Sequence, residues 1–224
     1  MNRSKSLGVA VASVLLGGAV IAGAGVWLAS AAPHQASLAC VPNSSTNSCD
    51  LKIATFPDSL EGVHGANGGP HPDWVTYSND NLVVPANTTI NVTIDQYDSG
   101  GPLNNYYLGN VIGTIGGTAI VNGKTVTHVD PTNVGHTFTL RNIPGNGSSL
   151  LVSVPRPADL NSKFPVKIGI GDYPKPVVVQ FSFKTGSKGV YEWNCEFPCG
   201  SSREGQFGFA MSSYGYMSGT LTVQ

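Results

Sequence analysis

The chain has 224 residues, enough for one domain of ordinary size and a segment outside it, and 41% of them are hydrophobic. Only 11% are charged and the formal net charge at pH 7 is -1, so the chain lacks the basic surface that nucleic-acid binding requires. Glycine, proline and small polar residues take the place of charged ones, and no long run of helix formers follows the N-terminus. This composition predicts an all-β domain.

The N-terminus carries a targeting signal. Arg3 and Lys5 precede an uncharged, largely apolar run over residues 6–33, which is about long enough to cross a bilayer as a helix. No further basic residue follows until Lys52, a distribution that predicts an inside N-terminus and a chain outside the cytoplasm. The small residues at 29–31 also fit a signal-peptidase site, so a membrane anchor and a cleaved signal, with secretion, both stay open.

Residues 34–73 are predicted to be a linker with a local disulfide. Cys40 and Cys49 flank the polar loop "CVPNSSTNSC", and in an oxidising space a pair at this spacing is most simply a disulfide. Residues 52–73 are rich in Gly, Pro and Asn and have no periodic apolar stripe. The sequence therefore predicts three parts: residues 1–33 as the signal or membrane anchor, residues 34–73 as the linker, and residues 74–224 as the domain.

Short strands dominate the domain. Ile90, Val92 and Ile94 alternate with polar residues, the pattern of a half-buried strand. Gly and Pro separate the other strand candidates, and no helical period lies between them, which predicts a β-sandwich or small barrel. Those candidates are residues 111–115, 118–121, 135–141, 150–154, 177–183, 189–194 and 218–223.

Two segments carry residues that bind metals. In "VGHTFTL", the strand period places His136 on the same face as Phe138 and Leu140, so the imidazole is predicted to point inward. It is either a core histidine satisfied by a backbone carbonyl or a metal ligand. In "VYEWNCEFPCGSSREGQFGFAMSSYGYMSGTLTV", a predicted strand ends at Cys195, and a loop with Cys199 leads to a final strand.

The order strand, Cys, loop, Met, strand resembles the ligand loop of cupredoxins, and "GHTFTL" is similar to their upstream histidine strand. This resemblance implies a Greek-key β-sandwich that binds copper. The Cys-x-x-x-Cys spacing also resembles the dinuclear copper loop in subunit II of haem-copper oxidases. A single N-terminal anchor with an outer cupredoxin domain is similar both to that subunit and to anchored sulfocyanin-like proteins.

Carried over residue by residue, the resemblance implies that His136 is the upstream imidazole, Cys195 the thiolate and Cys199 a second thiolate. Met217 matches the axial thioether better than Met211, because "MSGTLTV" leads directly into the final strand.

One imidazole is missing from this set. Blue copper sites use two His and one Cys, whereas no histidine follows Cys195 in this chain. The replacement ligands that stay open are a distant histidine or an oxygen donor: His64, His71, His128, Glu196 or a backbone carbonyl. A disulfide between Cys195 and Cys199 also stays open, and it would remove both thiolates.

Three functional hypotheses follow. The first is copper-dependent electron transfer by a membrane-anchored, extracytoplasmic protein, with a redox partner or a role like that of oxidase subunit II in a respiratory chain. The second is a copper-free accessory subunit of a membrane complex, held by a Cys195–Cys199 disulfide. The third is Cu(I) storage or delivery by the Cys pair and the exposed methionines. None of the three implies a substrate, so an electron carrier or non-catalytic subunit is favoured over an enzyme.

Overall fold

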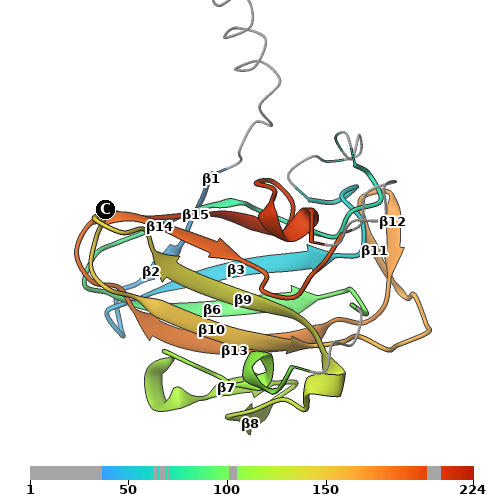
Figure 1. The fold of residues 1–224 in the computed structure, drawn as a ribbon, viewed down its shortest axis with the longest axis horizontal. Helices are drawn as coiled ribbons and strands as arrows, with labels where there is room; N and C mark the ends of the chain where they lie inside the picture. The colour runs from blue at the N-terminus through green and yellow to red at the C-terminus, as the bar shows by residue number, and fades with distance from the viewer. Residues whose placement is uncertain (1–36, 63–64, 66–68, 70, 101–104, 201–207) are drawn as a thin grey trace, which may run out of the picture. The chain divides into compact units, whose positions relative to one another are not determined.

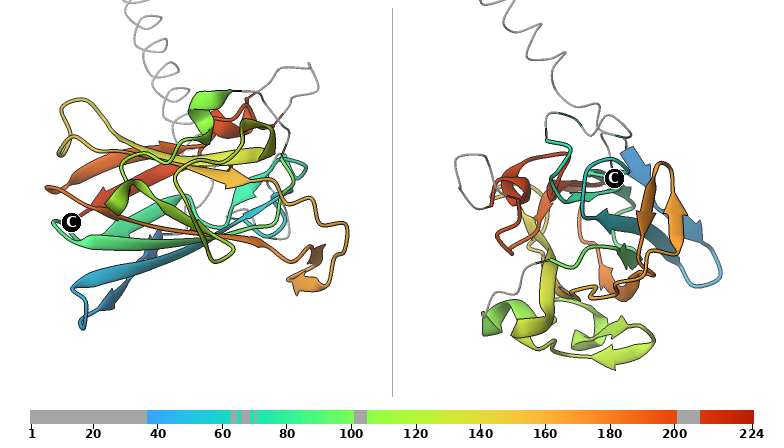
Figure 2. Two further views of the ribbon diagram at one scale, coloured as in Figure 1. Left: turned by 90° about the horizontal axis from the view of Figure 1, so that it is seen from below. Right: turned by 90° about the vertical axis from the view of Figure 1, so that its right-hand side faces the viewer.

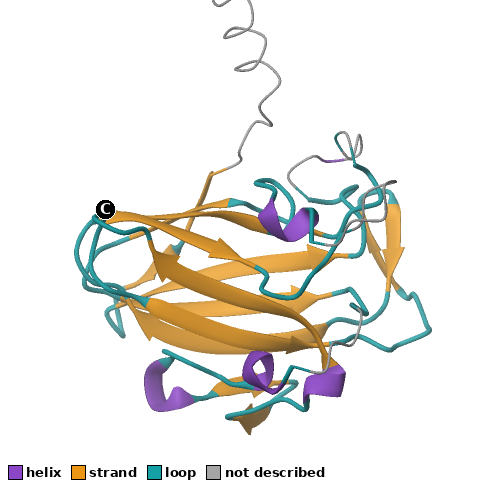
Figure 3. Ribbon diagram, in the orientation of Figure 1, coloured by secondary structure: helices purple, strands orange, loops and turns teal. Residues whose placement is uncertain are grey.

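The computed structural model of the chain describes residues 37–62, 65, 69, 71–100, 105–200 and 208–224. The predicted anchor or signal at residues 1–33 and the candidate ligand His64 lie outside these ranges. Residues 35–224 form one compact unit. In the described ranges, strands make up nearly all the regular structure and the helices are short 3₁₀ turns (Figure 3). No helix there is long and apolar enough to cross a membrane.

The first sheet has six strands (Figure 1). In spatial order they are β1 (Ser37–Ala39), β5 (Asn81–Val84), β15 (Ser218–Val223), β14 (Gly189–Asn194), β9 (Val134–Asn142) and β10 (Leu151–Pro157). β5 runs parallel to β1 and β15, and the other neighbours are antiparallel, so the sheet is mixed.

The second sheet has seven strands and forms the other layer of a sandwich (Figure 2). In spatial order they are β2 (Val41–Asn43), β3 (Ser48–Phe56), β6 (Thr89–Gln96), β13 (Val177–Lys184), β7 (Ala119–Val121) and β8 (Lys124–Val126), with β4 (Thr76–Tyr77) paired to β3. The hairpin of β11 (Val166–Ile168) and β12 (Gly171–Tyr173) stands apart. The 3₁₀ turns are η2 (Tyr106–Gly109), η3 (Ile115–Gly117), η4 (Pro131–Asn133) and η5 (Ala210–Ser212).

Alternation along the strands builds the core between the sheets. Along β6, Ile90, Val92 and Ile94 are buried and the residues between them are partly exposed, which confirms the predicted face. Phe138 on β9 packs against Phe181 on the opposite sheet, with ring centroids 5.8 Å apart. It also lies 5.6 Å from Trp193 on β14. The predicted all-β sandwich is confirmed, and its mixed sheets fit a cupredoxin fold.

The linker assignment for residues 34–73 was wrong in its first half. β1, β2 and β3 all come from this segment, and β3 alternates between buried and more exposed positions in a parallel pairing with β6. The sequence argument gave weight to the Gly- and Pro-rich residues that follow and missed the alternation of Cys49, Leu51 and Ile53. The sheets therefore begin near residue 37 rather than at residue 74.

The strand expected at residues 111–115 was also wrong. Gly113 adopts φ 72°, and a Cβ placed there would lie 1.8 Å from the backbone oxygen of Leu151. This left-handed conformation ends the extended run, so the segment makes only isolated bridges, and η3 begins at Ile115. The other predicted strands are present within a few residues of their expected bounds.

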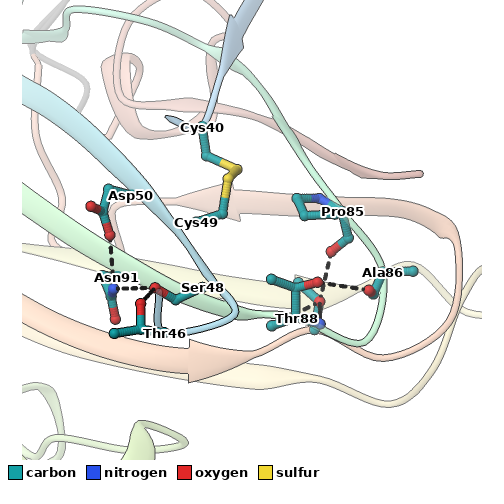
Figure 4. Close-up of a disulfide and its surroundings, with 10 residues drawn as sticks. Cys40, Thr46, Ser48, Cys49, Asp50, Pro85, Ala86, Thr88 and Asn91 are labelled. Carbon is teal, nitrogen blue, oxygen red and sulfur yellow. Dashed lines mark hydrogen bonds between the residues drawn. A yellow bond between two sulfur atoms is a disulfide. The ribbon is translucent and has the colours of Figure 1, made fainter. Parts of the chain in front are cut away.

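The disulfide between Cys40 and Cys49 is confirmed (Figure 4). Cys40 follows β1 in the first sheet, and Cys49 lies in β3 of the second sheet, next to β2. The bridge therefore fixes the point where the chain passes from one sheet to the other. Beside it, the Asn91 side-chain amide donates hydrogen bonds to Ser48 Oγ at 3.1 Å and to Asp50 Oδ1 at 2.8 Å, which tie β6 to β3.

A Cys40→Ala/Cys49→Ala variant is expected to have a free energy of unfolding lower by about 2–3 kcal/mol. The reason is that the disulfide between Cys40 and Cys49 no longer restricts the conformations of the unfolded chain. Urea unfolding of the full chain measures the loss. Reductant should reproduce it in the wild type and have no further effect on the variant. An unchanged unfolding midpoint in the variant would contradict the structural role of the bridge.

Candidate metal centre

Three predicted ligands meet inside the sandwich. One potential ligand atom from each of His136, Cys195 and Cys199 lies within 4.8 Å of the other two, and all three side chains are buried. Neither cysteine forms a disulfide in this structure. β9, which carries His136, pairs with β14 in an antiparallel register. It therefore lies next to the loop that follows β14 and holds both cysteines. The chain thus brings one imidazole and two thiols together from segments about sixty residues apart.

His136 is held from both sides of its ring. Its Nε2 hydrogen-bonds to the carboxylate of Asp98, and its Nδ1 lies 3.6 Å from Cys195 Sγ. Asp98 follows β6, and the same carboxylate oxygen accepts the Gly100 N–H at 2.9 Å. A carboxylate on the outer nitrogen of a histidine fixes the tautomer and ring orientation of a metal ligand. The alternative of a core histidine satisfied by a backbone carbonyl is therefore wrong.

Cys195 is positioned by its backbone neighbours. Its N–H donates to the Met217 carbonyl at 2.9 Å, a bond that continues the β14–β15 ladder past the last strand residues. Its Sγ accepts the Thr137 N–H at 3.4 Å. The Glu196 N–H in turn donates to Thr137 Oγ1 at 2.7 Å. The sulfur is fully buried and held by two strands, so its place does not depend on a loop conformation.

Cys199 lies in the turn after Cys195. Its carbonyl accepts the Ala210 N–H at 3.1 Å, and the Met217 N–H donates to the Ala210 carbonyl at 3.0 Å. Gly200, at φ 77°, reverses the chain directly after it. These bonds fold the start and the end of the ligand loop onto each other and keep the second thiol beside the first.

The two candidate methionines differ in their surroundings. Met217 is fully buried, and its backbone carbonyl accepts the Cys195 N–H, so the residue lies next to Cys195. Met211 is partly exposed and lines a different cavity of about 370 Å³, together with Arg141, Trp193 and Tyr214. Met217 therefore stays the better candidate for the thioether ligand.

The second imidazole is not found among the described residues. The His71 ring stacks on Trp74 with the ring centroids 3.8 Å apart, and the His71 backbone N–H donates to the Tyr216 hydroxyl at 3.2 Å. His128 Nδ1 bonds to Asn110 Oδ1 at 3.1 Å. Neither belongs to the group of converging ligand atoms. The other candidate is also engaged elsewhere, because Glu196 Oε1 accepts a hydrogen bond from Arg141 Nη1 at 2.6 Å.

The site divides its charges unevenly. Burial alone would raise the pKa of Cys195, but hydrogen bonds from Cys199 and His136 and nearby positive charge hold that pKa well below its ordinary value. The hydrogen bond to Cys195, together with burial, raises the pKa of Cys199. Of the two sulfurs, Cys195 therefore loses its proton first. Burial would lower the pKa of His136, yet its bonds to Asp98 and Cys195 raise it.

These residues suit a soft metal ion. A tetrahedral ion bonded at about 2.0 Å to nitrogen and about 2.3 Å to sulfur separates the two donors by roughly 3.5 Å, and Nδ1 and Sγ lie 3.6 Å apart. Thiolates select Cu(I) and zinc, and imidazole binds copper and zinc alike. A cavity of about 220 Å³ lined by Asp98, His136 and Cys199 lies beside the group.

Sequence reasoning missed two charged residues at this site. Asp98 lies in "DQYDSGG", directly after a strand, and only its hydrogen bond to His136 reveals its role. Arg156 on β10 is fully buried and opposes His136 in the β9–β10 register. The available signal was an arginine in the mostly apolar strand "LVSVPRP". Arginine is almost never fully buried unless it is paired, so an arginine in such a strand indicates a charged partner nearby.

Replacing Asp98 with Asn is expected to destabilise the copper-free, reduced protein by on the order of 3 kcal/mol where both partners are charged. Burial alone would raise the pKa of Asp98, but the hydrogen bond and charge of His136, the Gly100 N–H and the charge of Arg156 together lower it from 3.8. The contribution of this carboxylate therefore exists above that pH and is lost as pH falls through its folded pKa. The pKa of His136 is raised from 6.5, so its contribution is full below that pH and is lost as pH rises through its folded pKa.

The difference between wild type and Asp98→Asn should therefore be largest between pH 4 and pH 6.5 and should shrink on either side. Urea unfolding over a pH series measures it. Asp95→Asn, which removes a carboxylate paired with the exposed Lys52, is the control. A difference that does not change with pH would show that the two side chains are not an ion pair.

The comparisons with known proteins bear on the fold. No family model matches the sequence, and no curated protein matches it. Among solved structures, auracyanin B is 15% identical with a TM-score of 0.34, over 78% of this chain and 88% of that chain. The copper protein rusticyanin is 14% identical with a TM-score of 0.36, over 83% of this chain and 88% of that chain. Rusticyanin from Thiobacillus ferrooxidans gives 14% and 0.34, over 83% and 87%.

Rusticyanin is a copper protein. At TM-scores this low, the likeness carries no argument, and neither the metal nor the role of those proteins transfers to this chain. The chain resembles cupredoxins in its all-β sandwich.

Proposed function

We propose that this chain is a cupredoxin-like copper protein that carries single electrons outside the cytoplasm. The observation that supports the proposal is the convergence of His136, Cys195 and Cys199 in the interior of a β-sandwich. When bound, copper supplies a one-electron couple at a potential that its protein ligands set. In this proposal the protein is an electron carrier or a non-catalytic subunit rather than an enzyme.

The residues of the chain have three tasks in this role. His136, oriented by Asp98, presents Nδ1 toward the sulfur of Cys195, and Cys199 offers the second sulfur. Met217 is buried beside them as the candidate thioether. Phe197 and Trp193, both buried, help to exclude water from the interior around the donors. Because two paired strands hold Cys195, the donor set changes little between oxidation states, as fast electron transfer requires.

The predicted N-terminal anchor places this domain on the outer face of the cell membrane, where its partner is a redox protein or a respiratory oxidase complex. The role like that of oxidase subunit II belongs to this proposal and rests on the Cys-x-x-x-Cys spacing alone. A dinuclear centre needs two imidazoles, and one is present among the described residues that converge. A blue mononuclear site uses two imidazoles as well, and in the mononuclear site proposed here Cys199 takes the place of the second one.

A second function, Cu(I) binding for storage or delivery, is favoured by one specific observation. Two thiols and one imidazole form a softer donor set than two imidazoles and one thiol, and soft donors prefer the monovalent ion. It differs from electron transfer in lacking a reversible Cu(II) state. The copper-free alternative, an accessory subunit with a Cys195–Cys199 disulfide, needs both thiols to be oxidised.

The full chain is expected to bind one copper ion and to show a thiolate-to-copper band in the visible spectrum after Cu(II) is added. Cys195→Ser should abolish the band because it removes the central sulfur. Asp98→Asn should weaken copper binding about 10–100-fold, since the partner that orients His136 loses its charge. Metal analysis, free-thiol titration and visible spectroscopy measure these effects.

Two variants form a matched pair. Met217→Leu should shift the band or the reduction potential, whereas Met211→Leu should change neither. Copper bound only as Cu(I) with no band on oxidation would favour storage or delivery. No copper together with no titratable thiol would establish the copper-free disulfide protein and end the electron-transfer proposal.

A further inference from the structure

Arg156 is a fully buried cation without an ion-pair partner among the described residues. Its Nη1 donates to Thr55 Oγ1 on β3, so the side chain reaches from one sheet to the other. Its Nε and Nη2 atoms have no hydrogen-bond partner in the described part of the chain. Burying a charge is costly unless other charges compensate it. The compensation of the Arg156 charge must therefore come from nearby anions.

The guanidinium lies one aromatic ring away from the ligand group. Its Cζ is 4.5 Å from the centre of the Tyr77 ring, a cation–π contact. The Tyr77 hydroxyl donates to the Thr137 carbonyl at 3.3 Å, and the Thr137 N–H donates to Cys195 Sγ at 3.4 Å. Burial raises the pKa of Tyr77, so this ring stays neutral between the cation and the thiolate.

Among the protein groups of a metal-bound site, the anions outnumber the cations other than Arg156. Asp98 is charged, and a metal-bound Cys195 and Cys199 each add a negative charge, whereas neutral His136 adds none. Arg156 lies opposite His136 in the β9–β10 register, and His136 bonds to Asp98. Only the Tyr77 ring and the Thr137 backbone lie between the guanidinium and Cys195 in the contacts given above, so the cation acts on both anions. In a buried site such a charge acts over several ångströms with little screening.

We infer that Arg156 is an electrostatic positioning residue: its permanent buried charge compensates the anions around the copper ligands and favours monovalent over divalent copper. The inference rests on the proposed function. With copper bound, the redox partner of the proposed function would supply the one electron that converts Cu(II) to Cu(I), with no bond broken and no proton moved. A nearby cation stabilises the product, which carries one positive charge less, so Arg156 raises the reduction potential.

The test compares variants that keep and remove the charge. Arg156→Gln is expected to lower the preference for Cu(I) over Cu(II) about tenfold, which corresponds to a potential about 59 mV lower. Arg156→Lys should keep the preference within about threefold. Lys52→Gln removes an exposed cation on β3 and should change nothing. Voltammetry of the copper-loaded full chain and competition titrations with each ion measure these effects. Equal potentials for wild type and Arg156→Gln would overturn the inference.

A copper-free readout separates this inference from the proposed function. In the reduced, copper-free protein, the effects of Arg156→Gln and Asp98→Asn on stability should be coupled. The unfolding equilibrium constant of the double variant should be at least fivefold smaller than the two single effects together predict. Additive effects would overturn the inference. Should Arg156→Gln alone fail to fold, the double variant should fold, because it lacks both the cation and an anion. Failure of the double variant too would show that Arg156 serves packing alone.

If the wild type binds no copper, the proposed function fails, and the coupling between Arg156 and Asp98 still decides whether the buried cation compensates the anions. If copper binds and the coupling is absent, the proposed function stands and the role of Arg156 falls.

Discussion

The pairing of β14 with β9 on one side and β15 on the other is the constraint on which the candidate site depends. Asn194, the last residue of β14, lies opposite Thr139 on β9 and Ser218 on β15. Cys195 follows directly, so its sulfur meets the Thr137 N–H and its backbone meets Met217. A register slip of one residue would turn Cys195 and the alternating side chains of β14 to the opposite face. Trp193, buried on β14, resists such a slip because its ring fills the core.

Burial sets the chemical character of the site. In water, one carboxylate, one imidazole, two thiols and one guanidinium would interact weakly. Inside the sandwich, each charge persists only because another compensates it. The Asp98–His136 bond and the Arg156 cation are therefore as much a part of the site as the sulfurs. The hydrogen bond to Cys195, together with burial, raises the pKa of Cys199, so Cys199 keeps its proton and a metal that uses its thiolate must displace that proton.

Local patterns in the sequence predicted much of the fold. The alternation of Ile90, Val92 and Ile94 identified β6, the strand period predicted that His136 on β9 points inward, and the end of β14 placed Cys195 directly after it. Two kinds of feature were not predictable. The parallel pairing of β3 with β6 joins segments separated by a Gly-rich stretch that masks the signal, and the left-handed Gly113 breaks an otherwise extended run.

Sequence reasoning missed two charged residues of the site for the same reason. Asp98 and Arg156 carry ordinary local signals, a polar residue after a strand and a charge at a strand end. Their importance comes from where the topology places them: one beside the outer nitrogen of His136, the other across the Tyr77 ring. Single-residue patterns report burial and strand period, but they do not report which strand becomes a neighbour. The ligands themselves were predictable because sequence order in the loop, rather than spatial order alone, identifies them.

The two thiols make metal binding and disulfide formation mutually exclusive at this site. A thiolate next to a thiol is the arrangement from which a disulfide forms when an oxidant arrives, and an extracytoplasmic space supplies oxidants. Both sulfurs are buried, which limits the access of an oxidant to them. A metal ion that binds both sulfurs removes the thiolate from that reaction. Under the proposed function, copper bound to both sulfurs would protect the cysteines, and electron transfer would require the metal to arrive before the oxidant.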